Sequence, residues 1–160
     1  MKKIQSQKGF SIPEMLMAVL IMALTLSFIG GGVTVIKDAY LKITIRKEAQ
    51  ILLSTVITAI SKELQYADDV QKSDSYLNFY NIDRGYRMSF ENKNNNIYIR
   101  TEVGDEDKPL LIDKIMTNGL VPKIKDLTYI DQIFTYKIEI EYKNEVLAQQ
   151  EISIRPMNAD

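Results

Sequence analysis

The sequence predicts an α+β fold in which a long N-terminal helix packs on an antiparallel β-sheet head. Three observations predict it. Residues 10–36 are almost entirely apolar, residues 37–67 repeat apolar side chains at helical spacing, and residues 68–160 alternate apolar with polar side chains. A chain of 160 residues is long enough for one domain with a modest core beside such a helix.

Composition narrows the chemistry that this chain can perform. It has no cysteine, which excludes disulfides, zinc–thiolate sites and thiol catalysis. It has no histidine, the commonest general base and metal ligand at neutral pH. The 20 Lys and Arg nearly balance the 21 Asp and Glu, so overall charge indicates neither nucleic acid nor an acidic substrate. We therefore expect no enzymatic activity and no cofactor.

The first element is an apolar helix over residues 10–36, whose only charged side chain is Glu14. At about 1.5 Å per residue it reaches about 40 Å, more than the ~30 Å hydrocarbon core of a bilayer. It is also longer than the apolar region of a secretory signal peptide. This segment is therefore expected to cross a membrane.

Charges at its two ends predict the orientation. Lys2, Lys3 and Lys8 precede the segment, whereas Lys37 and Asp38 nearly cancel after it. The positive-inside rule places the N-terminus in the cytoplasm and the remainder outside. A plain membrane anchor that holds an outer domain would fit these facts as well.

An acid inside a membrane span costs a few kcal/mol and by default marks a functional site with a partner. Glu14 ends the sequence Gly-Phe-Ser-Ile-Pro-Glu, residues 9–14, which follows a short lysine-bearing leader. This arrangement resembles the processing site of type IV prepilins and type II secretion pseudopilins. Ile12 stands where leucine is more usual, which is a conservative change. Pro13 suits a first helical turn, where its missing N–H costs nothing.

The resemblance implies that residues 1–9 are a leader, cut off between Gly9 and Phe10 by a membrane prepilin peptidase that then methylates the new amino group of Phe10. Residues 10–36 would be the transmembrane and assembly helix. A carboxylate at Glu14 would neutralise the α-amino group of Phe10 on a neighbouring subunit as the two dock. On this interpretation the acid is tolerated because another chain supplies its counter-charge.

Gly30, Gly31 and Gly32 interrupt the apolar segment, and each costs up to about 1 kcal/mol against alanine in a helix. Filamentous relatives often carry Pro or Gly at about this depth, where the helix melts locally on assembly. The resemblance implies the same here. Close helix packing or a tolerated bend are the alternatives.

The second element, residues 37–67, continues the helix as an amphipathic stretch. No proline occurs between Met15 and Lys108, so both stretches are expected to fuse into one rod from Phe10 to about Ala67, roughly 85 Å long. Its apolar stripe, which we expect to pack on the head, is Ala49, Leu52, Leu53, Val56, Ile60, Leu64 and Ala67.

The head, residues 68–160, changes to a period of two from Ser75 onward. Asn92–Asn96 is expected to be a turn because Asn tolerates left-handed backbone; Asn118-Gly119 and Lys143–Glu145 are further expected turns. The expected strands are Leu77–Asn81, Tyr86–Glu91, Ile97–Val103, Phe134–Tyr142 and Val146–Arg155, with shorter ones near Leu110–Ile115 and Asp126–Ile130.

This order of elements matches the pilin fold. The sheet-rich head that ends in Glu151–Asn158 further resembles PilW-like minor pilins, J-type minor pseudopilins and ComGF. The resemblance implies a minor filament subunit whose partners are other pilin or pseudopilin subunits, prepilin peptidase, membrane lipid before assembly and an inner-membrane assembly platform. The rival class is a membrane-anchored binding module whose residues 68–160 recognise an extracellular ligand without polymerising.

Three weaker candidates lie in the head. Asp105, Glu106 and Asp107 cluster in a loop where calcium could bind, although a solvated loop explains them better and we expect no metal site. Asp68-Asp69 is expected to end the helix without an evident partner. An aromatic and basic face for single-stranded nucleic acid, which we consider an unfavoured partner, would use Arg84, Arg87, Arg100, Tyr80, Tyr86 and Tyr98.

Overall fold

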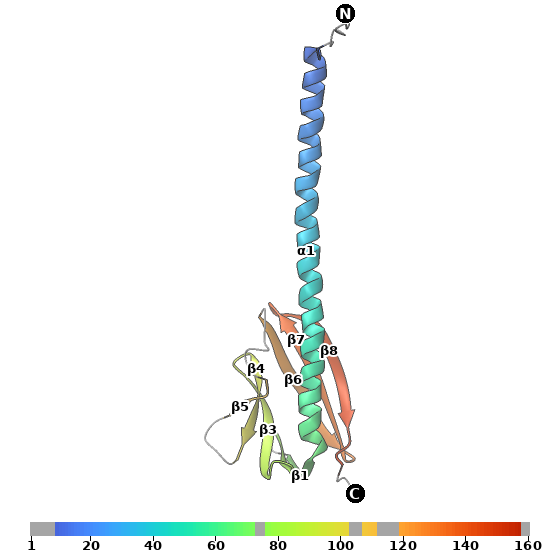
Figure 1. Cartoon of the computed structure of the whole chain (residues 1–160). Helices are drawn as coiled ribbons and strands as arrows, with labels where there is room; N and C mark the ends of the chain where they lie inside the picture. Colours follow the sequence, from blue (N-terminus) through green and yellow to red (C-terminus); the bar gives the residue numbers. More distant parts are fainter. Residues whose placement is uncertain (1–8, 73–75, 103–106, 112–118, 158–160) are drawn as a thin grey trace, which may run out of the picture. The chain divides into compact units, whose positions relative to one another are not determined.

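A computed structural model describes residues 9–72, 76–102, 107–111 and 119–157 of the chain. Helix α1 spans Ile12–Gln65, and the elements described after it are strands (Figure 1). The strands are β1 (Ala67–Lys72), β2 (Leu77–Asn81), β3 (Tyr86–Lys93), β4 (Asn96–Thr101), β5 (Lys108–Pro109), β6 (Leu120–Ile130), β7 (Ile133–Tyr142) and β8 (Glu145–Ile154). The chain divides into two compact units, residues 1–43 and 44–160. The α+β class is confirmed.

Helix α1 begins and ends within two residues of the expected limits, and its expected stripe is buried from Ala49 to Leu64. The assignment of Ala67 to the helix was wrong. Ala67 is the first residue of β1 and pairs with Asn81 of β2. The backbone carbonyl of Tyr66 accepts a hydrogen bond from the Ile82 N–H at 3.0 Å, so the chain turns from helix to strand within about one residue.

The strands form two antiparallel sheets. The first, which we call sheet A, has the order β1-β2-β3-β4-β5, and the second, sheet B, has the order β6-β7-β8. The tight turns between β3 and β4, β6 and β7, and β7 and β8 each use two left-handed residues, as two-residue hairpins require. These pairs are Asn94 and Asn95, Asp131 and Gln132, and Lys143 and Asn144. The asparagine-rich turn and the turn after Tyr142 are thus confirmed.

Other strand predictions need correction. β1 was not predicted, Leu110 and Leu111 form a bend instead of a strand, and the remainder of the expected strand, residues 112–115, lies outside the described part. β6 begins at Leu120, six residues before the expected start at Asp126. Pro122 fits within β6 because this strand lies at the edge of its sheet, where a missing N–H can face away from the neighbouring strand.

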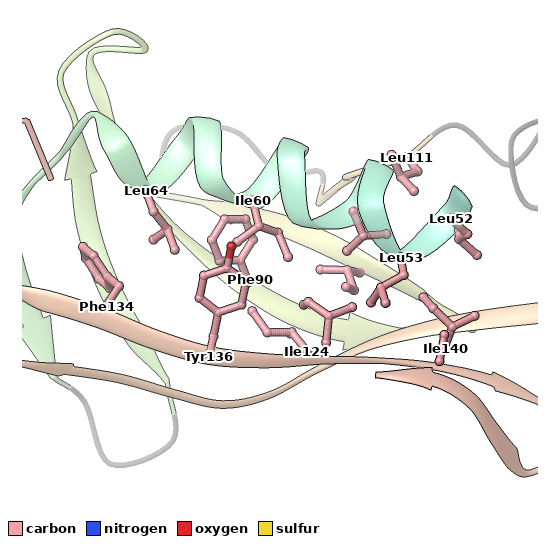
Figure 2. Packing of buried hydrophobic residues seen from close by; sticks show 14 of the residues in the cluster. Leu52, Leu53, Ile60, Leu64, Phe90, Leu111, Ile124, Phe134, Tyr136 and Ile140 are labelled. Carbon is pink, nitrogen blue, oxygen red and sulfur yellow. The ribbon is translucent and has the colours of Figure 1, made fainter. Parts of the chain in front are cut away.

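The helix and both sheets share one apolar core in the unit that spans residues 44–160. Figure 2 shows Leu64, Ile60, Leu53 and Leu52 on the helix facing side chains of the strands. Phe134, Tyr136, Ile138 and Ile140 of β7 are fully buried, which confirms the predicted inward face of that strand. The ring centres of Phe79 in β2 and Phe134 in β7 lie 5.9 Å apart, edge to face, and join the two sheets.

Polar contacts fix the same elements at their ends. Asn81 is fully buried, and its side-chain amide donates to the backbone oxygen and the carboxylate of Glu63 at 3.0 Å each. The second carboxylate oxygen of Glu63 lies 2.8 Å from Arg84, which raises the pKa of that guanidinium. The end of α1 is thereby tied to the turn between β2 and β3. Tyr136 reaches the helix from β7, where its hydroxyl lies 2.9 Å from Ser61 Oγ.

Candidate processing and assembly site

The expected cleavage site lies directly before α1. Gly9, Phe10 and Ser11 precede the first helical residue, Ile12, and all are exposed; the Phe10 side chain is 84% exposed. A Cβ placed on Gly9 would meet nothing within 4 Å. The Gly9–Phe10 bond is therefore reachable in this structure, while the leader residues 1–8 lie outside the described part.

Glu14 lies in the first turn of α1 and accepts two hydrogen bonds within its own chain. Its Oε2 accepts from the backbone N–H and from the hydroxyl of Ser11, both at 2.8 Å. This is one half of a capping box, in which an acid at the third helical position satisfies a backbone donor at the N-cap. The positive end of the helix dipole favours a carboxylate at this place.

This finding adds a second role for Glu14, and the interpretation that another chain supplies its counter-charge stays a prediction. A local capping role explains part of its presence, and the Ser-x-x-Glu spacing before an apolar run could have indicated it. Both Ser11 donors are neutral, so capping supplies no counter-charge. The donating N–H belongs to the Phe10–Ser11 peptide, which a cut between Gly9 and Phe10 would leave intact. Capping and docking by Glu14 are therefore compatible.

From Phe10 to Ile36 the described side chains are exposed, most of them apolar. α1 is long and apolar enough to cross a membrane, and none of its most apolar window is buried by the protein. An exposed apolar surface of this size needs lipid or another protein to cover it. The sequence expectation of a segment able to span a membrane is thus confirmed, whereas its orientation remains a prediction.

The helix continues without interruption through Gly30, Gly31 and Gly32. A Cβ at any of them would meet nothing within 4 Å, so close packing in this chain does not explain the glycines. The hydroxyl of Thr34 lies 3.2 Å from the carbonyl of Gly30 and 2.9 Å from that of Gly31. Such a donor can satisfy carbonyls that lose helical partners. Local melting in an assembled filament remains a prediction.

The proposed aromatic and basic face is only partly assembled. Cross-strand pairing places Tyr80 opposite Arg87 in sheet A, while the side chains of Arg100 and Tyr98 lie on the same face. Arg84 lies instead in the β2–β3 turn, bound to Glu63, and Tyr86 lies on the opposite face, paired with Asn81.

The acidic candidates behave differently from one another. Asp105 and Glu106 lie outside the described residues, and Asp107 forms an ion pair of 2.9 Å with Lys93. In the described ranges no group of acidic side chains gathers that could hold a metal. Asp68 and Asp69 do not end the helix as expected, since both belong to β1. Asp69 also has a partner, because its carboxylate and its backbone carbonyl both accept from Arg87.

An ion-pair ladder on the outer face of sheet B was not predicted. The carboxylate of Glu139 lies 2.5 Å from Lys125 and 2.7 Å from Lys137, and it is only 6% exposed. Hydrogen bonds from these two lysines lower the pKa of Glu139. Beside it, Glu141 lies 2.6 Å from Lys123. The alternation of charged with apolar side chains in β7 indicated a charged face, but its pairing with lysines of β6 depends on a register that the sequence does not show.

Comparison of the chain with protein-family models, with curated proteins and with solved structures finds no match.

Proposed function

We propose that this chain is a structural subunit, most similar to the minor subunits, of a type IV pilus or a related pseudopilus. The observation that carries the proposal is the coincidence of three features at one place. The Gly9–Phe10 bond lies exposed just before α1, Glu14 lies in the first turn, and an uncovered apolar surface follows as far as Ile36. A plain anchor requires the last of these features but neither of the first two.

The features have distinct tasks in this proposal. Lipid covers residues 10–36 before assembly, with the N-terminus in the cytoplasm and the head outside the cytoplasmic membrane. Prepilin peptidase cuts after Gly9 and methylates Phe10, which leaves a cation at the start of α1. An ATPase-driven assembly platform then moves the subunit into the filament, where Glu14 meets the amino group of a neighbour. Transfer out of the membrane is favoured because this charge pair exists only between docked subunits.

Shearing experiments test the proposal. Wild-type protein should enter the sheared filament fraction of cells that contain an active prepilin peptidase, and should remain in the membrane fraction when the peptidase is absent. A Gly9→Val variant should stay in the membrane in both strains. Equal membrane retention of the wild type and Gly9→Val in cells with active peptidase, where other pilins are sheared normally, would favour the rival, a membrane-anchored binding module that does not polymerise.

A further inference from the structure

Strands β2 and β3 separate part of the way along sheet A. Phe79–Asn81 of β2 pair with Tyr86–Met88 of β3, whereas Leu77 and Asn78 pair only with β1. β3 continues beyond this point and pairs with β4 as far as Lys93. Among the described strands, none pairs with Ser89–Lys93 on the side of β2. Within the residues that the structure describes, one edge of β3 is therefore unpaired there, with main-chain groups that a further strand could use.

A cavity of about 550 Å³ lies where the strands separate. Its apolar lining includes Leu77, Phe90 and Ile124, each less than one tenth exposed. The wall opposite β3 is the edge of β6, where a bulge between Lys125 and Thr128 interrupts the pairing with β7. Asn92 connects the two walls, because its side chain donates to the Ile124 carbonyl at 2.7 Å and accepts from the Ile124 N–H at 2.9 Å. We call this cavity the β3–β6 groove.

Arg100 lies at the rim of the groove and also lines an adjoining cavity of about 280 Å³, together with Tyr76 and Ser89. Its guanidinium carbon is 5.6 Å from the centre of the Tyr76 ring. The Glu91 carboxylate is 3.9 Å away, too far for a hydrogen bond, and Arg100 is 55% exposed. Within the described part of the chain, its guanidinium donors thus remain available to a ligand.

We propose that the β3–β6 groove binds an extended peptide segment of a partner protein that carries an acidic side chain. The main chain of the peptide pairs with the open edge of β3 at Ser89–Glu91, before the Asn92–Ile124 contact, as in recognition by strand addition. Its carboxylate meets Arg100 in a charge-assisted hydrogen bond, and Tyr and Arg are the residue types that dominate such contacts. An apolar side chain covers Leu77 and Phe90. This inference concerns the head alone and does not depend on filament formation.

Single-stranded nucleic acid fits the groove less well. Two of the nearby cations are already neutralised, since Lys125 lies 2.5 Å from Glu139 and Arg87 is bound to Asp69. A nucleic acid would bring a phosphate at every nucleotide close to Glu91 and Asp126, which also line the groove, whereas the peptide needs only one carboxylate beside Arg100. The unpaired N–H and C=O groups of a strand edge match the main chain of a peptide, and the backbone of a nucleic acid does not offer the same pattern of donors and acceptors.

The geometry predicts the sequence of the peptide. Phe90 and Arg100 lie on opposite faces of sheet A, since Phe90 pairs with Ile99 and Ser89 with Arg100. The sequence positions of the acidic and the aliphatic side chain in the bound strand must therefore differ by an odd number, as those of direct neighbours do. Selection of a random heptapeptide display library on the full-length protein in detergent micelles should enrich Asp or Glu directly beside Val, Ile or Leu.

A fluorescent version of the enriched peptide then gives the affinity. Arg100→Ala should weaken binding by about tenfold or more, Arg100→Lys should weaken it less, and Lys143→Ala, which removes an exposed cation in the distant β7–β8 turn, should leave it unchanged. N-methylation of peptide amides that face β3 should abolish binding, while methylation of the alternating amides should be tolerated.

Three results would overturn the inference. They are a selection that enriches no peptide, equal binding to the wild type and Arg100→Ala, and indifference to the pattern of N-methylation. Binding of fluorescent oligothymidine in place of any peptide would assign the groove to nucleic acid instead. Loss of filament incorporation would not affect these binding measurements, so failure of the proposed function and failure of this inference can be distinguished.

Discussion

At the scale of single residues, Glu14 combines two tasks that require different properties. Capping of the Ser11 N–H needs an oxygen acceptor, whereas docking against the amino group of a neighbour needs a negative charge. Glutamine keeps the acceptor and loses the charge, and alanine loses both. The hydroxyl of Ser11 adds a second hydrogen bond, which alanine at that position would remove without altering the charge.

We therefore expect Glu14→Gln to leave membrane insertion and helix capping intact but to reduce incorporation into sheared filaments several-fold. Glu14→Ala should reduce it at least as much, and Ser11→Ala should reduce it only slightly. The comparison uses the ratio of sheared to membrane-bound protein at equal expression. If Glu14→Gln enters filaments as well as the wild type, charge neutralisation is not the docking step.

Glu139 predicts how stability depends on pH. Lys125 and Lys137 lower its pKa below the ordinary value of 4.5, so the charged form is favoured by folding. Its contribution is complete above about pH 4.5 and declines as the pH falls through the lower pKa of the folded state. We expect the free energy of unfolding of Glu139→Gln to fall less steeply below pH 4.5 than that of the wild type. Urea unfolding followed by near-ultraviolet circular dichroism measures this difference.

The exposed Glu145, in the β7–β8 hairpin, provides the matched control. Glu145→Gln should leave the acid dependence as it is in the wild type. A Glu139→Gln chain whose stability falls with acid as steeply as that of the wild type would show that this carboxylate gains nothing from its lysines.

At the scale of elements, local pattern predicted the helix and the strands that pack on it. The apolar stripe of α1 and the alternation in β7 depend on burial, so the sequence displays them directly. β1 escaped prediction because Ala67–Lys72 is short, polar and largely exposed, and is held as a strand by pairing with β2. The start of β6 escaped prediction because Pro122 argues against a strand unless the strand lies at a sheet edge. That position, and the contact of Asn92 with β6, cannot be seen in the sequence.

The glycines of α1 give a prediction at this scale. Replacement of Gly30, Gly31 and Gly32 by alanine should be accepted by the isolated chain, because added Cβ atoms meet nothing nearby. Each replacement stabilises the helix by up to about 1 kcal/mol. Amide hydrogen exchange around residues 30–34 should therefore slow in micelles. If assembly requires local melting, incorporation into filaments should fall.

A Thr34→Val variant distinguishes the effect of the glycines from the effect of the Thr34 hydroxyl. It removes the hydroxyl that reaches the carbonyls of Gly30 and Gly31 but leaves the glycines in place. Slower exchange in the triple-alanine chain together with undiminished incorporation would refute melting as a step of assembly.

At the scale of the whole molecule, the order of elements followed from the sequence, but the division of the head into two sheets did not. The packing of the two sheets on each other depends on contacts such as Phe79 with Phe134 and Asn92 with Ile124, between residues far apart in the chain. The candidate site was predictable at Gly9, Phe10 and Glu14 because its features are contiguous. The Ser11 cap had a signal in the Ser-x-x-Glu spacing, whereas the β3–β6 groove had none because it depends on the divergence of β2 from β3.

The intact mass of the mature chain, purified from membranes of cells with and without active prepilin peptidase, tests the central claim most directly. With the enzyme, the chain should begin at Phe10, lack residues 1–9 and carry one added methyl group on its amino terminus. Without the enzyme, it should begin at Met1 or, after removal of the initiator, at Lys2. A chain that keeps its first nine residues in the presence of active peptidase would contradict the account.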